Sequence, residues 1–93
     1  MTNEQIIFKA ASAFLGLDEA EAGNMLMLGQ FPAFHTYEAW KELGYQVQKG
    51  QHSCFSAQIW KMTEKKNAEG ERTQKLIMKR AHFFARNQVE KIN

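Results

Sequence analysis

The stretches that decide the fold are SCFSAQIWKMT at residues 53–63 and QKLIMKRAHFFAR at residues 74–86. In both stretches hydrophobic residues alternate with others at a period of two, which is typical of a β-strand that buries one face. Residues 64–73 between them are highly polar and include Gly70, so we expect a hairpin loop there. The sequence therefore predicts one long antiparallel β-hairpin.

The predicted hairpin needs a cover on one face, because two strands alone are only marginally stable in water. The alternation predicts an inner face made of Phe55, Ala57, Ile59, Ala81 and Phe83. The outer face then carries Gln58, Trp60, Met62, Arg80 and His82, and Phe84 is a further candidate for it. A bulge or a register shift of one residue would exchange the two faces.

Three segments upstream of the hairpin carry helix signals. Capping-box patterns begin the first two, a threonine cap begins the third, and a glycine is placed to end each one. The expected helices occupy residues 2–16, 18–29 and 36–44. Residues 30–35, which contain Pro32, are expected to form a loop.

These elements predict an α+β fold in which N-terminal helices pack on one face of an antiparallel β-hairpin or small sheet. We expect residues 1–93 to form a single domain, since no stretch resembles a linker. The hydrophobic run at residues 25–28 is far shorter than the roughly 18 residues of a membrane span. The single cysteine, Cys54, forms no internal disulfide, and the N-terminus lacks a basic signal region. We therefore expect a cytoplasmic protein without a membrane partner.

The net charge of +2 conceals an uneven distribution. Residues 1–40 hold one basic and five acidic residues, a net charge of −4, and residues 41–93 hold eleven basic and five acidic residues, a net charge of +6. Such a split indicates that one side of the fold meets an anion, most often a nucleic acid. The alternative is that the lysines and arginines only solvate the hairpin.

The predicted outer face of the hairpin combines an aromatic ring with cations. Trp60 lies near Arg80 and His82 on that face, and Lys61 and Lys79 flank it. Unpaired bases stack on aromatic and guanidinium planes while nearby cations hold the phosphates. The face is therefore a candidate platform for single-stranded nucleic acid, unless Trp60 is buried as an ordinary core residue.

A second signal lies in residues 36–50, which read TYEAWKELGYQVQKG. This Thr-aromatic-x-x-Trp helix and the Gly-x-x-Val-x-x-Gly turn after it resemble the N-terminal domain of the ArdC-type antirestriction proteins of plasmids, phages and related mobile elements. Residues 59–61, the polar loop at 64–73 and the aromatic stretch 82–88 fit the same pattern. The resemblance covers roughly residues 24–90 and implies a domain that binds single-stranded DNA.

In full-length members of that family, the resemblance further implies, this domain precedes a metalloprotease-like domain. The His-Glu-x-x-His motif of such a domain does not occur in this sequence, so that activity is not carried over. Within the motif, Trp40 and Val47 are expected to be core residues. The candidate nucleic-acid-binding residues are Lys41, Tyr45, Lys49, His52, Trp60, Lys61, Lys79, Arg80, His82 and Arg86.

We expect bases to stack on Trp60, with His82 and Tyr45 assisting. The residues expected to contact phosphates are Lys49, Lys61, Lys79, Arg80 and Arg86. Catalytic and metal-binding motifs are missing from the sequence. His52-x-Cys54 has no second pair of ligands, and the glycines form neither a Walker A loop nor a GxGxxG fingerprint. The sequence therefore predicts neither an enzyme nor a cofactor site.

The alternative function is a protein–protein interaction module. Residues 25–28, Met-Leu-Met-Leu, follow acidic residues in the second predicted helix and could offer an adaptable apolar surface to a partner or a second copy. A homo-oligomer is one form of this alternative. The opposing interpretation is that these residues cover the inner face of the hairpin.

Overall fold

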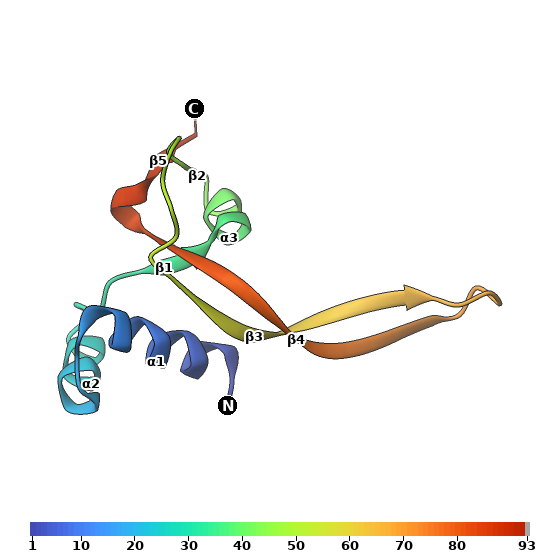
Figure 1. Cartoon of the computed structure of the whole chain (residues 1–93), viewed down its shortest axis with the longest axis horizontal. Coiled ribbons are helices and arrows are strands. Elements are labelled where there is room, and N and C mark those ends of the chain that lie inside the picture. The colour runs from blue at the N-terminus through green and yellow to red at the C-terminus, as the bar shows by residue number, and fades with distance from the viewer. Residues whose placement is uncertain (93) are drawn as a thin grey trace.

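A computed structural model describes residues 1–92 of the chain (Figure 1). Its helices are α1 (Asn3–Leu15), α2 (Glu19–Met27), α3 (Tyr37–Glu42) and the 3-10 helix η1 (Arg86–Gln88). Its strands are β1 (Phe34–Thr36), β2 (Tyr45–Val47), β3 (Phe55–Lys66), β4 (Arg72–Ala85) and β5 (Val89–Lys91). One antiparallel sheet has the order β1-β4-β3, and β2 pairs with β5 in a second. The predicted α+β class is confirmed.

The helix starts follow from side-chain caps. Thr2 and Asp18 each form a complete capping box, and the Thr36 hydroxyl accepts a hydrogen bond from the N–H of the third residue of α3. Gly16 ends α1 in the left-handed conformation with a φ of 72°, and Gly44 turns the chain after α3 with a φ of 91°. The three predicted helices are therefore confirmed, with ends that differ by one or two residues.

The hairpin is longer than the sequence pattern predicts. β3 and β4 pair in an unbroken register from Phe55 opposite Phe83 to Lys66 opposite Arg72. The expected loop at 64–73 is therefore wrong, and only residues 67–71 form the turn. The polar residues occupy strand positions because this half of the hairpin projects away from the helices (Figure 1), where a strand needs no hydrophobic face.

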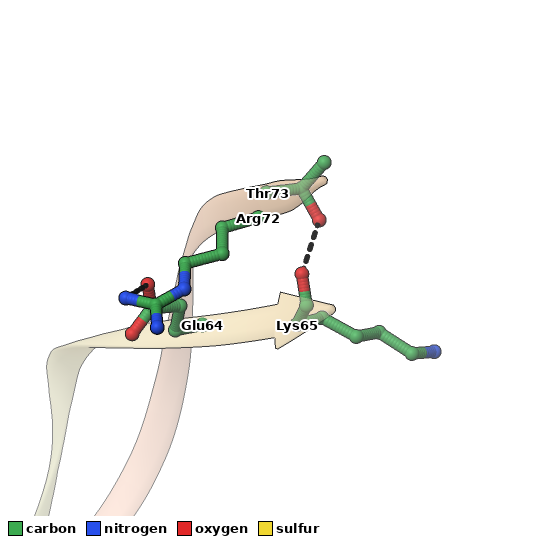
Figure 2. Close-up of polar contacts among 4 residues, drawn as sticks. All are labelled: Glu64, Lys65, Arg72 and Thr73. Atoms are coloured by element: carbon green, nitrogen blue, oxygen red, sulfur yellow. Dashed lines mark hydrogen bonds and ion pairs between the residues drawn. The ribbon is translucent and has the colours of Figure 1, made fainter. Parts of the chain in front are cut away.

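Side-chain contacts close to the tip hold the two strands together (Figure 2). The Thr73 hydroxyl donates to the backbone carbonyl of Lys65 at 3.1 Å. Arg72 Nη1 lies 3.4 Å from Glu64 Oε1, and both side chains are mostly exposed. Exposed ion pairs contribute little stability, so the backbone ladder carries most of the order of this segment.

The turn is organised by the side chain of its first residue. Asn67 Oδ1 accepts hydrogen bonds from the backbone N–H groups of Glu69 and Glu71, at 3.0 and 2.9 Å. Gly70 adopts a φ of 82°, a left-handed conformation that favours glycine. The predicted turn role of Gly70 is thereby confirmed within a shorter turn.

The main core lies between α1 and the proximal part of the hairpin. Ala11 of α1, Phe34 of β1 and Phe83 of β4 are buried, and the Phe55 ring stacks on Phe83 with centroids 5.1 Å apart. The partly buried residues that pack against them include Ile7, Leu15, Ala57, Ile59 and Ala81. The predicted inner face is therefore confirmed.

Three short strands were not predicted. β1 lies partly in the expected loop at 30–35, and β2 and β5 lie in segments that show no alternation. Three residues are too few for a period of two to stand out. Near the C-terminus, Val89 is buried, whereas Ile92 is 41% exposed and its backbone N–H donates to the Gly44 carbonyl. Asn93 lies outside the described residues.

Trp40 joins α3 to the hairpin. Its side chain is 3% exposed, and its Nε1–H donates to the backbone carbonyl of Phe84 at 2.9 Å. The His35 and Tyr45 rings pack edge-on against it. Trp40 is thus the core residue that the motif predicts, while Val47 is only partly buried.

The hydrophobic end of α2 does not cover the hairpin. Leu26, Met27 and Leu28 are 56%, 87% and 69% exposed, and α2 lies at the opposite end of the molecule from the hairpin tip (Figure 1). The interpretation that these residues cover the inner face is therefore wrong, because α1 already occupies that place. Within residues 1–92, no helix combines the length and the hydrophobicity needed to span a membrane.

Candidate nucleic-acid interface

A groove of about 680 Å³ opens where the hairpin leaves the body, beside the N-terminus of α3. Its walls come from three parts of the chain: the β1–α3 junction, the segment before β3, and the proximal hairpin. The lining residues are Thr36, Tyr37, Glu38, Gln51, His52, Ser53, Ile59, Lys61, Lys79, Arg80, Ala81, His82 and Phe84.

Positive charge dominates this groove. Lys61, Lys79 and Arg80 contribute three permanent cations, against the single carboxylate of Glu38. All three basic side chains are exposed, so they can meet an incoming anion without first losing a buried partner. A concave, cationic lining of this kind concentrates the local field and favours a polyanion.

Two of the polar side chains on the groove wall have defined partners. Arg80 Nη1 donates to Ser56 Oγ at 2.9 Å across the strand pair. His82 Nδ1 lies 3.5 Å from Ser53 Oγ, which links β4 to the segment before β3. These contacts orient a guanidinium plane and an imidazole ring on the same wall.

Gln88 holds the segment before β3 in place. Its Nε2 donates to the backbone carbonyl of His52 at 2.6 Å and to Gln51 Oε1 at 3.2 Å. Its Oε1 accepts from the Ala85 N–H at 2.9 Å and from the Cys54 thiol at 3.1 Å. Gln88 therefore fixes one wall of the groove, a role that the sequence analysis did not predict.

The ten predicted site residues do not form one surface. Five of them line the groove: His52, Lys61, Lys79, Arg80 and His82. Tyr45 and Arg86 form a separate pair, with the guanidinium carbon 4.5 Å from the ring centroid. Lys41 lies in the last turn of α3, and Lys49 lies beside the turn at Gly50, both outside the groove lining.

Trp60 is exposed but does not line the groove. Its side chain is 43% exposed, so the alternative that Trp60 is ordinary core is wrong. Adjacent strand residues point to opposite faces, which puts Trp60 on the side away from Lys61 and on the same side as Arg80 and His82. Its cross-strand partner there is Met78, and Met62 and Leu76 continue the same hydrophobic patch. Trp60 is not among the groove residues.

The backbone of Trp60 anchors the start of α1. The Trp60 N–H donates to Asn3 Oδ1 at 2.8 Å, and Asn3 Nδ2 donates to the Trp60 carbonyl at 2.9 Å. A side-chain amide thus pairs with β3 as a neighbouring strand would. The sequence pattern contains no signal for this pairing.

Tyr37 is the groove aromatic that the sequence analysis missed. Its ring is 52% exposed at the first position of α3. It is brought to the groove by β1, whose Thr36 pairs with Phe83. Predicting β1 would have placed Tyr37 next to the end of the hairpin, so the missed strand accounts for the missed residue.

Metal ligation has no geometric basis in the described part of the chain. Residues 1–92 contain no group of three or more His, Cys, Asp or Glu side chains placed to hold a metal ion. Cys54 is partly buried and donates to Gln88, so its thiol serves packing and hydrogen bonding.

The comparisons with known proteins give one match. The family model described as the N-terminal domain of anti-restriction factor ArdC matches residues 19–89. That range contains every residue of the groove and leaves α1 outside. The comparison with curated proteins and the comparison with solved structures found no match to the chain.

Proposed function

Because this chain belongs to the family of the N-terminal domain of anti-restriction factor ArdC, we propose that it binds single-stranded DNA in the groove beside α3. The family is not known to be catalytic, and the proposed role is accordingly that of a binding domain. An antirestriction function in a plasmid or phage is the biological setting that this proposal adopts.

The observation that carries the proposal is the combination of cations and rings in one groove. Lys61, Lys79 and Arg80 are placed to neutralise phosphates. Tyr37 and His82 offer faces on which unpaired bases can stack, and such stacking contributes about 1–3 kcal/mol per base. The base faces of a duplex are already stacked, so this mixture favours a single strand.

The predicted residues outside the groove receive a smaller role. Lys41, Lys49 and Arg86 add to the long-range attraction of a polyanion rather than to specific contacts. The Tyr45 ring is covered on one face by Arg86, so we assign it no base. The stacking role moves from Trp60 to Tyr37, because Trp60 lies outside the groove.

The test is fluorescence anisotropy of a labelled thymine strand of about twenty nucleotides beside the matching duplex, at several salt concentrations. We expect tighter binding to the single strand and a fall in affinity as salt rises. The Lys79→Ala/Arg80→Ala variant should bind weakly, whereas Lys91→Ala, which removes an exposed cation that does not line the groove, should bind like the parent. Equal affinity for the duplex, or no binding at low salt, would overturn the proposal.

A second candidate function rests on the exposed end of α2. Leu26, Met27 and Leu28 form a hydrophobic surface next to acidic residues of the same helix, which suits a protein partner or a second copy. Sedimentation velocity at tens of micromolar tests the version with two copies. A dimer that Met27→Ser dissociates would support it, and a monomer would remove it.

A further inference from the structure

The distal half of the hairpin is a projecting arm, which we define as residues 61–79. Figure 1 shows it extending away from the helices along the longest axis of the molecule, whose extent is 51 Å. The arm carries six basic and three acidic residues. Most of its side chains are exposed on both faces, so the arm is available to solvent or to a ligand and takes little part in the core.

The two faces of the arm differ in chemistry. The register puts four lysines on one face, where their cross-strand partners are isoleucine or threonine; these four are Lys61, Lys65, Lys75 and Lys79, called here the lysine row. The opposite face carries the hydrophobic patch around Met62, and nearer the tip Glu64, which pairs with Arg72. Among residues 1–92 this is the one salt bridge, so no carboxylate neutralises the lysine row.

The spacing of the lysine row is regular. Successive lysines alternate between β4 and β3, and each step advances two residues along the ladder. Two residues of β-strand span about 7 Å. That step is about twice the rise of 3.4 Å per nucleotide in a stacked DNA strand. A single strand with unstacked bases can extend to such a spacing, so that one phosphate meets each lysine.

The lysine row is continuous with the groove. Lys61 and Lys79 belong to both, because they line the groove and also begin the row. At the other end, the turn presents Glu69 and Glu71, whose exposed carboxylates repel phosphates. The lysine row therefore begins at the groove and ends before the turn at the hairpin tip.

We infer that the backbone of single-stranded DNA continues from the groove along the lysine row, so that Lys65 and Lys75 hold phosphates beyond those bound in the groove. This inference rests on the proposed function. According to this inference, the arm increases the length of DNA strand that the protein binds. The hydrophobic patch on the other face of the arm does not contact nucleic acid.

Two variants that remove equal charge from the two faces test the lysine row. Lys65→Ala/Lys75→Ala removes two cations from the row, and Lys66→Ala/Arg72→Ala removes two cations from the opposite face of the same segment. Both are first compared with the parent by circular dichroism and thermal unfolding. Binding is then measured with thymine strands of about six and about twenty nucleotides.

The lysine row predicts a loss that depends on probe length. Lys65→Ala/Lys75→Ala should bind the long strand about tenfold more weakly, and the magnitude of the log–log salt slope should fall by about 1.4, which corresponds to two phosphates of a single strand. Its affinity for the short strand should equal that of the parent. Lys66→Ala/Arg72→Ala should change either affinity by less than about twofold.

Other outcomes separate failure of the row from failure of the groove. Equal losses in the two variants, or no loss in either, would overturn the lysine row while the groove stands. Equal affinity of the parent protein for the short and the long thymine strand would also overturn the lysine row while the groove stands. A parent that binds neither strand would overturn the proposed function and the row together.

Discussion

Gln88 shows how one side chain can set the shape of the groove. It makes four hydrogen bonds, and these join η1 to the segment before β3 and to the end of β4. Gln88→Ala should lower the free energy of unfolding by about 2 kcal/mol, because four hydrogen bonds are lost and two of them are partly buried. It should also weaken binding of the thymine strand, since His52 is no longer held at the groove.

The matched control is Gln74→Ala. Gln74 is exposed on the arm, and its side chain makes no hydrogen bond within the described part of the chain. Thermal unfolding and anisotropy should both leave this variant close to the parent. A Gln88→Ala protein with unchanged stability would contradict the anchoring role.

Tyr37 and Trp60 give opposite predictions for two exposed aromatic residues. Tyr37→Ala should reduce the binding free energy by about 1–3 kcal/mol, the usual contribution of one stacked base. Trp60→Ala should change affinity by less than about twofold, because Trp60 does not line the groove. Anisotropy with the same thymine strand compares them, and a larger loss in Trp60→Ala would restore the hairpin-face platform that the sequence suggested.

At the scale of elements, the arm folds as a ladder with little support from the core. Asn67→Ala removes the acceptor for two backbone N–H groups of the turn, which should destabilise the arm by about 1 kcal/mol. Amide hydrogen exchange should accelerate in residues 61–79 and stay unchanged around Phe83. Asn87→Ala, an exposed asparagine in η1 whose side chain makes no hydrogen bond within residues 1–92, is the control. Faster exchange throughout the core would contradict an independent arm.

The elements themselves were largely predictable, because their signals are local. Capping boxes and glycines located all three helices, and alternation located β3 and β4 together with their buried face. The strand limits near the tip were not predictable from polarity, since polarity reports burial and the arm is not buried. The three-residue strands depend on pairing partners far away in the sequence, such as β1 on β4, and local patterns do not contain that information.

The difference between local signals and long-range contacts also explains which residues of the candidate site could be predicted. Charge and aromatic content pointed to the half of the chain that supplies most of the groove lining, and five of the ten predicted residues meet in the groove. The separation of Trp60 from Lys61 follows from strand alternation and was within reach of the sequence. The position of Tyr37 at the groove and the anchoring by Gln88 could not be predicted from the sequence, because both depend on contacts between segments that only the folded chain brings together.

On the scale of the whole molecule, the projecting arm should be the first target of a protease. It is exposed, lies far from the core and contains six lysine or arginine residues, so trypsin should cut within residues 61–79 before it cuts the body. A bound thymine strand should slow cleavage after Lys65 and Lys75 more than cleavage after Lys66. Mass spectrometry of the early fragments measures both effects. First cuts in α1 would contradict the prediction.

The amide of Asn3 against the backbone of Trp60 has a consequence for self-association. β3 is the outer strand of its sheet, and exposed strand edges act as templates on which other chains add by hydrogen bonding. Asn3 occupies both backbone groups of Trp60 and interrupts that template where the hairpin leaves the body. Farther along β3, the charged side chains of the arm disfavour the pairing of a second chain through the cost of bringing charges together. Helix α1, which lies outside the matched family range, thereby blocks strand addition at this edge position through Asn3 and also covers the core.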